Sequence, residues 1–260
     1  MEFICQKNQI EELKKLAQSD RHSVLIEGLF GTGKTYLAKQ YAKMLNIDDF
    51  IIVSPKVNDI KETIDSCLQT DNRVLLCIEN LDLGVPAASY ALLKFLEEPL
   101  PYVYIVVTCR SLDSVPGTIP SRSTVVRTNP PTENDLELYA KNSKADRYIA
   151  LQNNPLLKCV KTFTDMNTVL SLDVNQLKYF ESLNELSKFT DSISSIVWKL
   201  GHYENNDPTP VELVIRYIME ICNTRHIEKC GIDCIRDLSL SRVAAHAVLA
   251  KFAFNCKYCE

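Results

Sequence analysis

The sequence lacks any apolar run of the roughly 18 residues that a membrane-spanning helix needs, so we expect no membrane association. Residues 1–16 mix charged with apolar side chains, and we expect no secretory signal. An excess of basic residues is also missing, because 29 Lys and Arg stand against 33 Asp and Glu, for a net charge of −4. This balance excludes a generally basic nucleic-acid coat, and any DNA contact would come from a local patch.

No internal repeat or low-complexity tract divides the 260 residues, which suffice for one large or two to three small domains. Most of the ten cysteines lie singly in or beside apolar patterns, where cysteine is typically a small core residue. Two closer pairs, Cys230 with Cys234 and Cys256 with Cys259, leave a four-thiolate zinc site open, although their spacing matches no standard zinc signature. We favour free thiols.

One short segment matches a phosphate-binding pattern at every fixed position. Residues 28–35 read Gly-Leu-Phe-Gly-Thr-Gly-Lys-Thr, which fits G-x-x-x-x-G-K-[ST]. The glycines let backbone N–H groups turn toward phosphate oxygens, Lys34 brings positive charge, and the Thr35 hydroxyl can hold Mg²⁺. A strand pattern precedes the segment and a helical pattern follows it, so the helix N-terminus adds to the anion site. The predicted nucleotide-binding residues are Gly28, Gly31, Thr32, Gly33, Lys34, Thr35 and Tyr36. The alternative is a chance match or a loop that no longer binds nucleotide.

Strand and helix patterns alternate through the first half of the chain. Short apolar runs lie at residues 24–26, 50–53, 73–78, 102–107 and 124–126. Because helical patterns separate them, they predict an α/β fold with a five-stranded parallel sheet that is covered on both faces. Ligands of such sheets bind beyond the carboxyl ends of the strands. After Pro130-Pro131 the strand patterns fade, Thr132 and Asp135 resemble a capping box, and the rest is predicted to be helical.

The apolar run at 73–78 ends in Glu79 and Asn80. In phosphate-loop ATPases an acidic residue at this place serves Mg²⁺, and a glutamate after it activates water. Glu79 can therefore join Thr35 as a metal ligand, whereas Asn80 cannot accept a proton, so the general base is missing at its expected position. Asp82 would need a different backbone path to act as that base. A merely polar turn is the alternative for residues 79–82.

Residues 74–99 resemble AAA+ sliding-clamp loader subunits, such as the DNA polymerase III gamma and delta-prime subunits and the small subunits of replication factor C. In that family D-E-A-D ends the strand and A-L-L-K-x-L-E-E-P-P follows, and residues 91–99 read Ala-Leu-Leu-Lys-Phe-Leu-Glu-Glu-Pro. Residues 118–123, Thr-Ile-Pro-Ser-Arg-Ser, are similar to the family's T-I-x-S-R-C. The resemblance implies an AAA+ nucleotide-binding core at 1–130, a helical lid at 131–182 and a helical collar or oligomerisation domain at 183–260.

The resemblance also implies ATP and Mg²⁺ as cofactors and gives roles to individual residues. Arg122 would be an arginine finger that reaches the nucleotide of a neighbouring subunit. A surface ion pair is the plainer interpretation of Arg122. Sensor 1, a polar residue at the end of the strand beside Glu79, would be Thr108, whereas counting back from Arg122 lands on Cys109 or Arg110.

The sequence departs from the family pattern in three places. Asn80 replaces the catalytic glutamate, and Leu157 stands where a sensor 2 arginine is expected, with Lys158 as a weak substitute. The four-cysteine zinc module of bacterial loader subunits is absent. We expect a compact, divergent subunit with weak intrinsic hydrolysis, in the cytoplasm of a bacterium or of a phage-infected host, and leave a viral origin open.

The implied function is that of a clamp-loader subunit in a homo- or hetero-oligomer. Together with other loader subunits it would bind a sliding clamp and place it on primer–template DNA, which it would contact at backbone phosphates. Two alternatives stay open. One is a hydrolysis-deficient AAA+ scaffold that supplies Arg122 to a partner. The other is a different AAA+ machine, such as a helicase loader or a remodeller.

Overall fold

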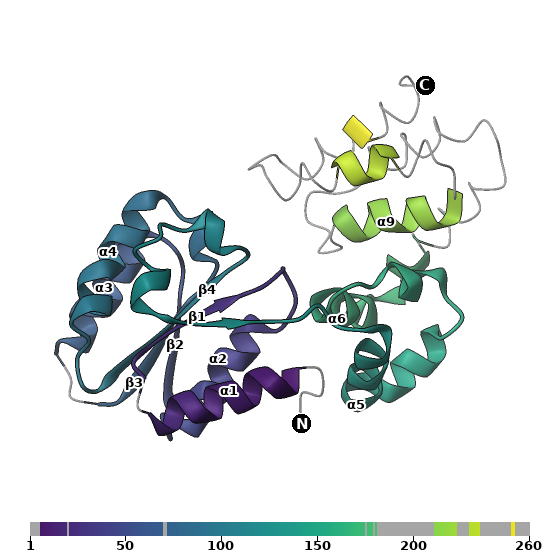
Figure 1. Ribbon diagram of the computed structural model, residues 1–260. Coiled ribbons are helices and arrows are strands. Elements are labelled where there is room, and N and C mark those ends of the chain that lie inside the picture. Colours follow the sequence, from purple (N-terminus) through teal and green to yellow (C-terminus); the bar gives the residue numbers. More distant parts are fainter. Residues whose placement is uncertain are drawn as a thin grey trace. The chain divides into compact units, whose positions relative to one another are not determined.

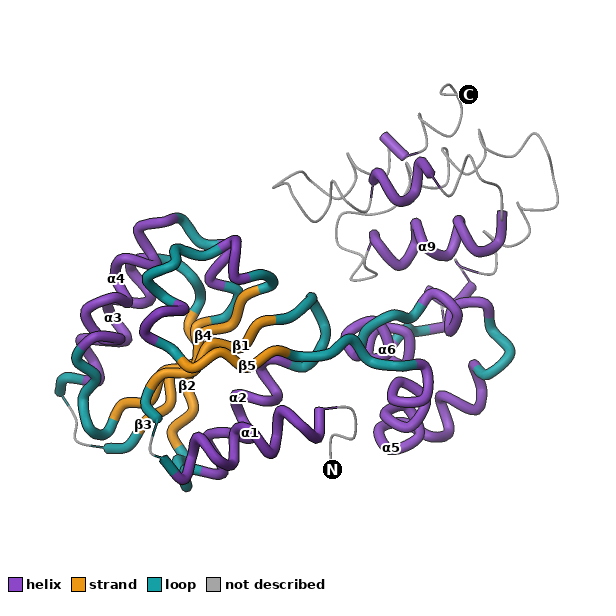
Figure 2. Tube along the Cα trace, viewed as in Figure 1, coloured by secondary structure: helices purple, strands orange, loops and turns teal. Residues whose placement is uncertain are grey.

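A five-stranded parallel sheet forms the centre of residues 1–136 in the computed structural model (Figures 1 and 2). Its strands are β1 (Ser23–Glu27), β2 (Asp49–Val53), β3 (Val74–Ile78), β4 (Val103–Cys109) and β5 (Thr124–Arg127). They are ordered β2-β3-β4-β1-β5, and every neighbouring pair is parallel. The predicted α/β fold with a five-stranded parallel sheet is therefore confirmed. In this order β4 lies between β1 and β3, which places its carboxyl end between theirs.

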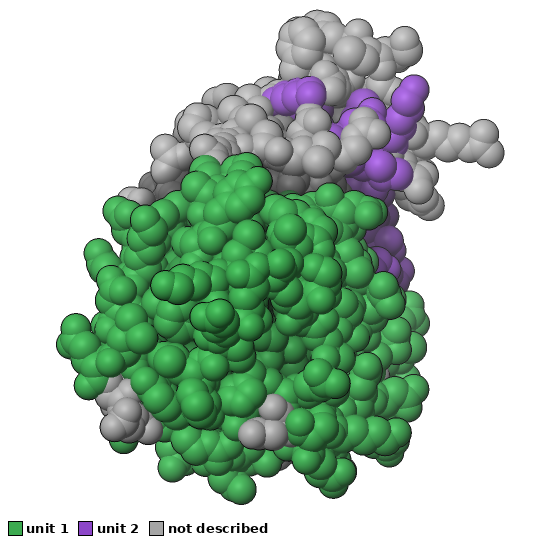
Figure 3. All heavy atoms as spheres, turned by 60° about the vertical axis from the view of Figure 1, so that its left-hand side comes forward, with its two compact units in different colours: residues 1–136 green, residues 137–260 purple. Residues whose placement is uncertain are grey.

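The structure describes residues 6–19, 21–69, 72–174, 176–178, 180, 211–222, 229–234 and 251–252. The chain divides into two compact units, Met1–Leu136 and Glu137–Glu260, which Figure 3 colours separately. Most of the predicted collar, and with it Cys256 and Cys259, lies outside the described residues. The predicted division of the second half into lid and collar stays a prediction.

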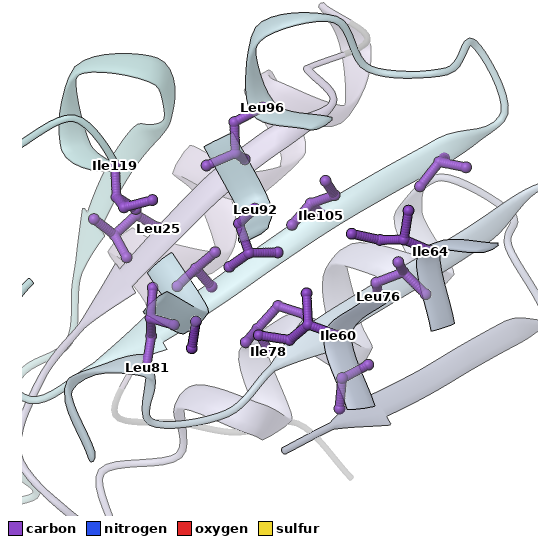
Figure 4. Packing of buried hydrophobic residues seen from close by; sticks show 14 of the residues in the cluster. Leu25, Ile60, Ile64, Leu76, Ile78, Leu81, Leu92, Leu96, Ile105 and Ile119 are labelled. Carbon is purple, nitrogen blue, oxygen red and sulfur yellow. The ribbon is translucent and has the colours of Figure 1, made fainter. Parts of the chain in front are cut away.

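Helices cover the two faces of the sheet in pairs. On one face α1 (Lys7–Gln18) packs against α2 (Lys34–Met44), and on the other α3 (Val57–Cys67) packs against α4 (Pro86–Glu97). Successive strand residues alternate between the two cores, because side chains on a strand point to opposite faces. Leu25 belongs to the core beneath α3 and α4 (Figure 4), whereas its neighbours Val24 and Ile26 belong to the core beneath α1 and α2. All five residues of β3 and all seven of β4 are buried.

Strand β2 departs from the expectation that helices cover both faces throughout. It is an edge strand that pairs with β3 alone. Ile51 and Ile52 are 41% and 49% exposed, although Val53 is buried in the core. An apolar run therefore identified the strand correctly, but the prediction of full burial was wrong here, because a strand with a single neighbour is only partly covered.

The described part of the second unit contains helices and turns. These are α5 (Glu133–Leu151, which begins within the first unit), the 3₁₀ turn η5 (Pro155–Cys159), α6 (Phe163–Ser171) and α9 (Val211–Cys222). The predicted capping box is confirmed, because Thr132 and Asp135 exchange hydrogen bonds at the start of α5. Lys144 breaks the regular backbone inside α5 with φ −148°. No helix in the described part of the chain combines the length and apolarity of a membrane-spanning segment.

Within the part of the chain that was predicted to be helical, residues 155–159 form the 3₁₀ turn η5, and α6 begins only at Phe163. Two ion pairs join these segments to α9: Lys158 lies 3.2 Å from Glu220, and Arg216 lies 2.9 Å from Asp165. Lys158, the weak candidate for sensor 2, therefore has a carboxylate partner within its own unit.

Candidate nucleotide-binding site

The phosphate-loop pattern lies between β1 and α2, which is the strand–loop–helix context that it requires. Gly31 and Gly33 have φ of 72° and 92°, in the left-handed region that glycine adopts without a side-chain clash. Helix α2 starts directly after Gly33. Thr32 is buried and closes the loop, because its hydroxyl donates to the Leu29 carbonyl at 2.9 Å and bonds the Thr128 hydroxyl at 2.9 Å.

Gly28 fixes the start of the loop against two strands. Its N–H donates to the Cys109 carbonyl at the end of β4, with an N–O distance of 3.1 Å. A Cβ atom on this residue would lie only 1.7 Å from the Thr128 hydroxyl oxygen, just after β5. Glycine is thus required by close packing as well as by the sequence pattern.

Lys34 points back into the loop that precedes it. Its ammonium donates to the carbonyls of Gly28 at 2.8 Å and Leu29 at 3.0 Å. Burial lowers the pKa of Lys34, and the negative charge of Asp82 is the strongest effect that opposes this shift. The two hydrogen bonds hold the Lys34 side chain at the start of the loop. Tyr36 follows in the first turn of α2, where burial raises the pKa of its phenol.

The two predicted metal ligands meet in space although 44 residues separate them. The Thr35 hydroxyl donates to the Glu79 carboxylate at 2.5 Å. A hydroxyl and a carboxylate oxygen are hard donors, and Mg²⁺ is commonly held by one or two carboxylates together with the phosphates of its nucleotide. Within the described ranges, no group of three or more His, Cys, Asp or Glu forms a metal cage. Cys230 and Cys234 are buried, and the other two cysteines of the possible zinc site, Cys256 and Cys259, lie outside the described residues.

Asn80 and Thr108 are also brought together. The Asn80 N–H donates to the Thr108 hydroxyl at 2.8 Å, and Thr108 is buried at the end of β4. Asn80 has φ 49°, a left-handed conformation that asparagine tolerates better than most residues. The sequence left Thr108, Cys109 and Arg110 as alternatives for sensor 1. Of these, Thr108 is the residue whose side chain contacts Asn80, directly after Glu79.

Asp82 forms an ion pair that the sequence did not reveal. Its carboxylate lies 2.5 Å from Nε of Arg110 and accepts the Arg110 N–H at 3.3 Å, and the Asp82 side chain is fully buried. A carboxylate fixed in this way is poorly suited to act as a base. One feature of the sequence could have indicated this ion pair: Arg110 directly follows the buried strand β4, which pairs with the strand that leads into the loop.

Gln6 is a second contributor that sequence reasoning missed. It is fully buried at the start of α1, and its amide donates to the Thr32 carbonyl at 3.3 Å and to the Asn129 carbonyl at 2.8 Å. It thereby ties the first helix to the loop and to the segment after β5. A single glutamine carries no pattern by which these contacts could be found.

Arg122 lies apart from this cluster. It is exposed at the end of the 3₁₀ turn η4 (Pro120–Arg122), where its guanidinium lies 2.6 Å from the Glu97 carboxylate and donates to the Thr118 carbonyl at 3.1 Å. These contacts are all with nearby surface groups. Within this chain Arg122 therefore forms a surface ion pair, which was the alternative to the arginine finger. A role toward a neighbouring subunit stays a prediction.

The order of strand, loop and helix, with an acidic residue after β3, is the arrangement that phosphate-loop α/β proteins have in common. Comparison with known proteins shows which phosphate-loop proteins this chain is similar to. Residues 51–132, about a third of the chain, match the family model described as DNA polymerase III, delta subunit. This match includes Glu79, Asn80 and Arg122 but not the loop at 28–35.

Two individual proteins extend the comparison. The chain is 26% identical over 151 residues to DNA polymerase III subunit gamma of Buchnera aphidicola subsp. Schizaphis graminum, an alignment that covers 46% of this chain and 42% of that relative. The matched part of this chain thus spans less than half of the relative's length. The crystal structure of a DNA polymerase III gamma subunit-related protein from Thermotoga maritima matches with a TM-score of 0.59 and 19% identity, over 96% of this chain and 98% of that chain. This last likeness shows the fold alone. The chain is therefore similar to gamma- and delta-type subunits of DNA polymerase III, which supports a clamp-loader-like family.

Proposed function

We propose that this chain is a clamp-loader subunit that binds ATP with Mg²⁺ and works with neighbouring subunits to place a sliding clamp on primer–template DNA. The observation that carries the proposal is the meeting of Lys34, Thr35 and Glu79 at one loop of a fold similar to DNA polymerase III subunits. Partners of this kind follow from the likeness to subunits of a multisubunit replication complex.

The residues around the loop fit a magnesium nucleotide. The N–H groups at the start of α2 and the Lys34 ammonium would hold the phosphates, and Thr35 with Glu79 would hold Mg²⁺. When bound, Mg²⁺ supplies positive charge to the outer phosphates. Lys34 already makes two hydrogen bonds that fix its ammonium, so little ordering remains to be done on binding.

Turnover by this chain alone is expected to be weak. Asn80 has no group that accepts a proton, and Asp82 is engaged by Arg110. Nucleotide would then serve mainly as an assembly signal, with hydrolysis dependent on neighbouring subunits. The scaffold alternative shares this weakness and differs in that nucleotide at this loop would have no effect on clamp binding.

Replacing Lys34 with alanine should weaken Mg-ATP binding by about 10- to 100-fold, because hydrogen bonds to charged groups contribute about 1.5–3 kcal/mol. Isothermal titration of the purified chain measures this directly. Lys43→Ala is the matched control, since Lys43 is exposed in the last turn of the same helix. If Lys34→Ala binds Mg-ATP as tightly as Lys43→Ala and the unchanged chain, the proposal that this loop binds ATP is wrong.

The clamp-loader proposal itself is tested by capture of the sliding clamp encoded in the same genome. Native mass spectrometry of the chain with its partner subunits should show a clamp-containing complex with Mg-ATP and at least several-fold less of it with Mg-ADP. Absence of the clamp in every nucleotide state would contradict a loader and favour another AAA+ machine. Equal capture with ATP, ADP and no nucleotide would favour the scaffold.

A further inference from the structure

Strand β2 leaves one edge of the parallel sheet open. In the described part of the chain it pairs with β3 alone, and its residues Ile51 and Ile52, which point to opposite faces, are 41% and 49% exposed. Edge strands are usually protected by lysine, proline or a bulge. Residues 49–53 read Asp-Phe-Ile-Ile-Val, and their one-to-one register with β3 contains no bulge. The edge of β2 therefore lacks the features that commonly prevent pairing with another strand.

The backbone groups of Phe50 and Ile52 point away from the sheet. The Val53 carbonyl accepts the Glu79 N–H at 3.0 Å, so the polar backbone groups of Val53 face β3. The N–H and C=O of one strand residue point to the same side, and this side alternates along the strand. Ile51 therefore also faces β3, whereas Phe50 and Ile52 face outward. Among the described residues no strand lies on that outer side, so two N–H and two C=O groups are open to a partner.

This spacing of outward groups is self-complementary. When two copies of β2 lie antiparallel about a twofold axis at Ile51, each Phe50 is opposite Ile52 of the other copy. Such a pair exchanges both of its backbone hydrogen bonds, so all outward groups are satisfied. The two Ile51 side chains then meet across the axis on one face of the sheet, and Phe50 meets Ile52 on the other. A twofold axis of this kind gives the commonest form of protein dimer.

The charges at the two ends of β2 favour the antiparallel orientation. Asp48 and Asp49 at its start are exposed, and so is Lys56 beyond its end. With the axis at Ile51, Asp48 lies opposite residue 54 of the other copy. Lys56 of that copy is then a diagonal neighbour, which a long side chain can reach. A parallel arrangement of two copies would instead bring the acidic starts together.

We propose that β2 is a dimerisation strand, through which two copies of this chain pair edge to edge and join their sheets into one. A second copy fits better than an unrelated strand, because both the hydrogen-bonding register and the charges of β2 complement themselves. The pairing goes beyond the proposed function and uses no residue of the phosphate loop. Since β2 has only five residues, the dimer is weak, with a dissociation constant on the order of 10–100 μM.

Sedimentation velocity of the full chain, at concentrations below and above this range, measures the association. Ile51→Lys should weaken it by at least about 10-fold, because two like charges then lie directly opposite each other at an edge. Ile149→Lys is the matched control: Ile149 is 63% exposed in α5, and this variant should dimerise like the unchanged chain. Melting temperatures verify that each variant is folded. A monomeric unchanged chain, or an Ile51→Lys chain that dimerises as tightly, would overturn the proposal.

Cysteine substitutions test the pairing axis. Opposite residues of a non-hydrogen-bonded antiparallel pair have Cα atoms about 4.5 Å apart, within the range of about 4.4–6.8 Å that a disulfide spans. Under mild oxidation Ile51→Cys should therefore form a disulfide-linked dimer. Ile52→Cys lies opposite Phe50 of the other copy and should give several-fold less. The unchanged chain, with its ten cysteines, provides the background. Equal cross-linking in the two variants would contradict an axis at Ile51.

Charge reversal tests whether the partner is a second copy. Asp48→Lys and Lys56→Asp should each weaken dimerisation by about 3- to 10-fold, because each change acts at two symmetric contacts. The double variant should regain most of the lost affinity, since opposite charges meet again. Failure to recover would overturn the antiparallel pairing of two copies and leave the edge of β2 to a strand of another protein.

Discussion

Replacing Arg122 with alanine should lower ATP turnover of the assembled complex by about 10³- to 10⁵-fold, the contribution known for arginine fingers. Nucleotide binding by the isolated chain should stay unchanged. The reason lies in the position of the side chain, which is exposed and whose contacts are Glu97 and the neighbouring Thr118 and Ser121. An arginine presented on the surface in this way can reach a neighbour's nucleotide. Steady-state hydrolysis, with assembly verified by native mass spectrometry, provides the measurement.

Glu97→Gln separates the finger from the surface ion pair. This variant removes the carboxylate that lies 2.6 Å from Arg122 and leaves the guanidinium in the chain. An exposed pair of this kind contributes only about 0–1 kcal/mol to stability, so a purely structural role would give two equally mild variants. A role toward the neighbour predicts that turnover falls in Arg122→Ala and persists in Glu97→Gln. Loss of nucleotide binding by the isolated Arg122→Ala chain would rule out action on a neighbour.

The sheet was predictable because burial on both faces leaves a clear mark in the sequence. Strands β3 and β4 are buried at every position, and such continuous apolar runs are typical of parallel strands beneath helices. The exposure of Ile51 and Ile52 was not predictable in the same way. It depends on the position of β2 at the edge, and strand order is decided by packing between segments far apart in the chain.

In the second unit, apolar spacing predicted helical structure without distinguishing its kinds. A spacing of three residues occurs both in an α-helix and in a 3₁₀ turn. Pro155 and the side chain of Asn154, which accepts from the Leu156 N–H at 3.0 Å, begin a 3₁₀ turn in a region that was predicted only to be helical. The irregular backbone at Lys144 had no visible cause in the sequence.

The candidate site was predictable as far as local motifs reach. The loop at 28–35 and the acidic end of β3 each follow from a contiguous pattern, and their meeting follows from the rule that ligands bind at the carboxyl ends of parallel strands. The ion pair between Asp82 and Arg110 joins residues 28 positions apart, and the contact of Gln6 with Asn129 spans 123 positions. Such single pairs leave no periodicity in the sequence. They arise only once the strands are ordered.

Replacing Asn80 with glutamate should raise the single-turnover rate of Mg-ATP hydrolysis by about 10²- to 10⁴-fold, the usual contribution of a general base. The position is suitable because Asn80 directly follows Glu79 and its N–H is fixed by the Thr108 hydroxyl at 2.8 Å. Asp82, the other nearby carboxylate, cannot compensate while Arg110 binds it at 2.5 Å. Measurement at saturating nucleotide keeps differences in affinity out of the comparison.

Asn80→Gln is the control that isolates the carboxylate. The left-handed backbone at this position, with φ 49°, costs a longer side chain about 1–2 kcal/mol, and glutamine bears this cost equally without being able to accept a proton. The two variants should therefore melt at similar temperatures and differ in rate. Equal rates in both would show that the base comes from elsewhere or that another step limits turnover. That result would favour the scaffold alternative, in which this chain contributes Arg122 to hydrolysis on its neighbour and needs no base of its own.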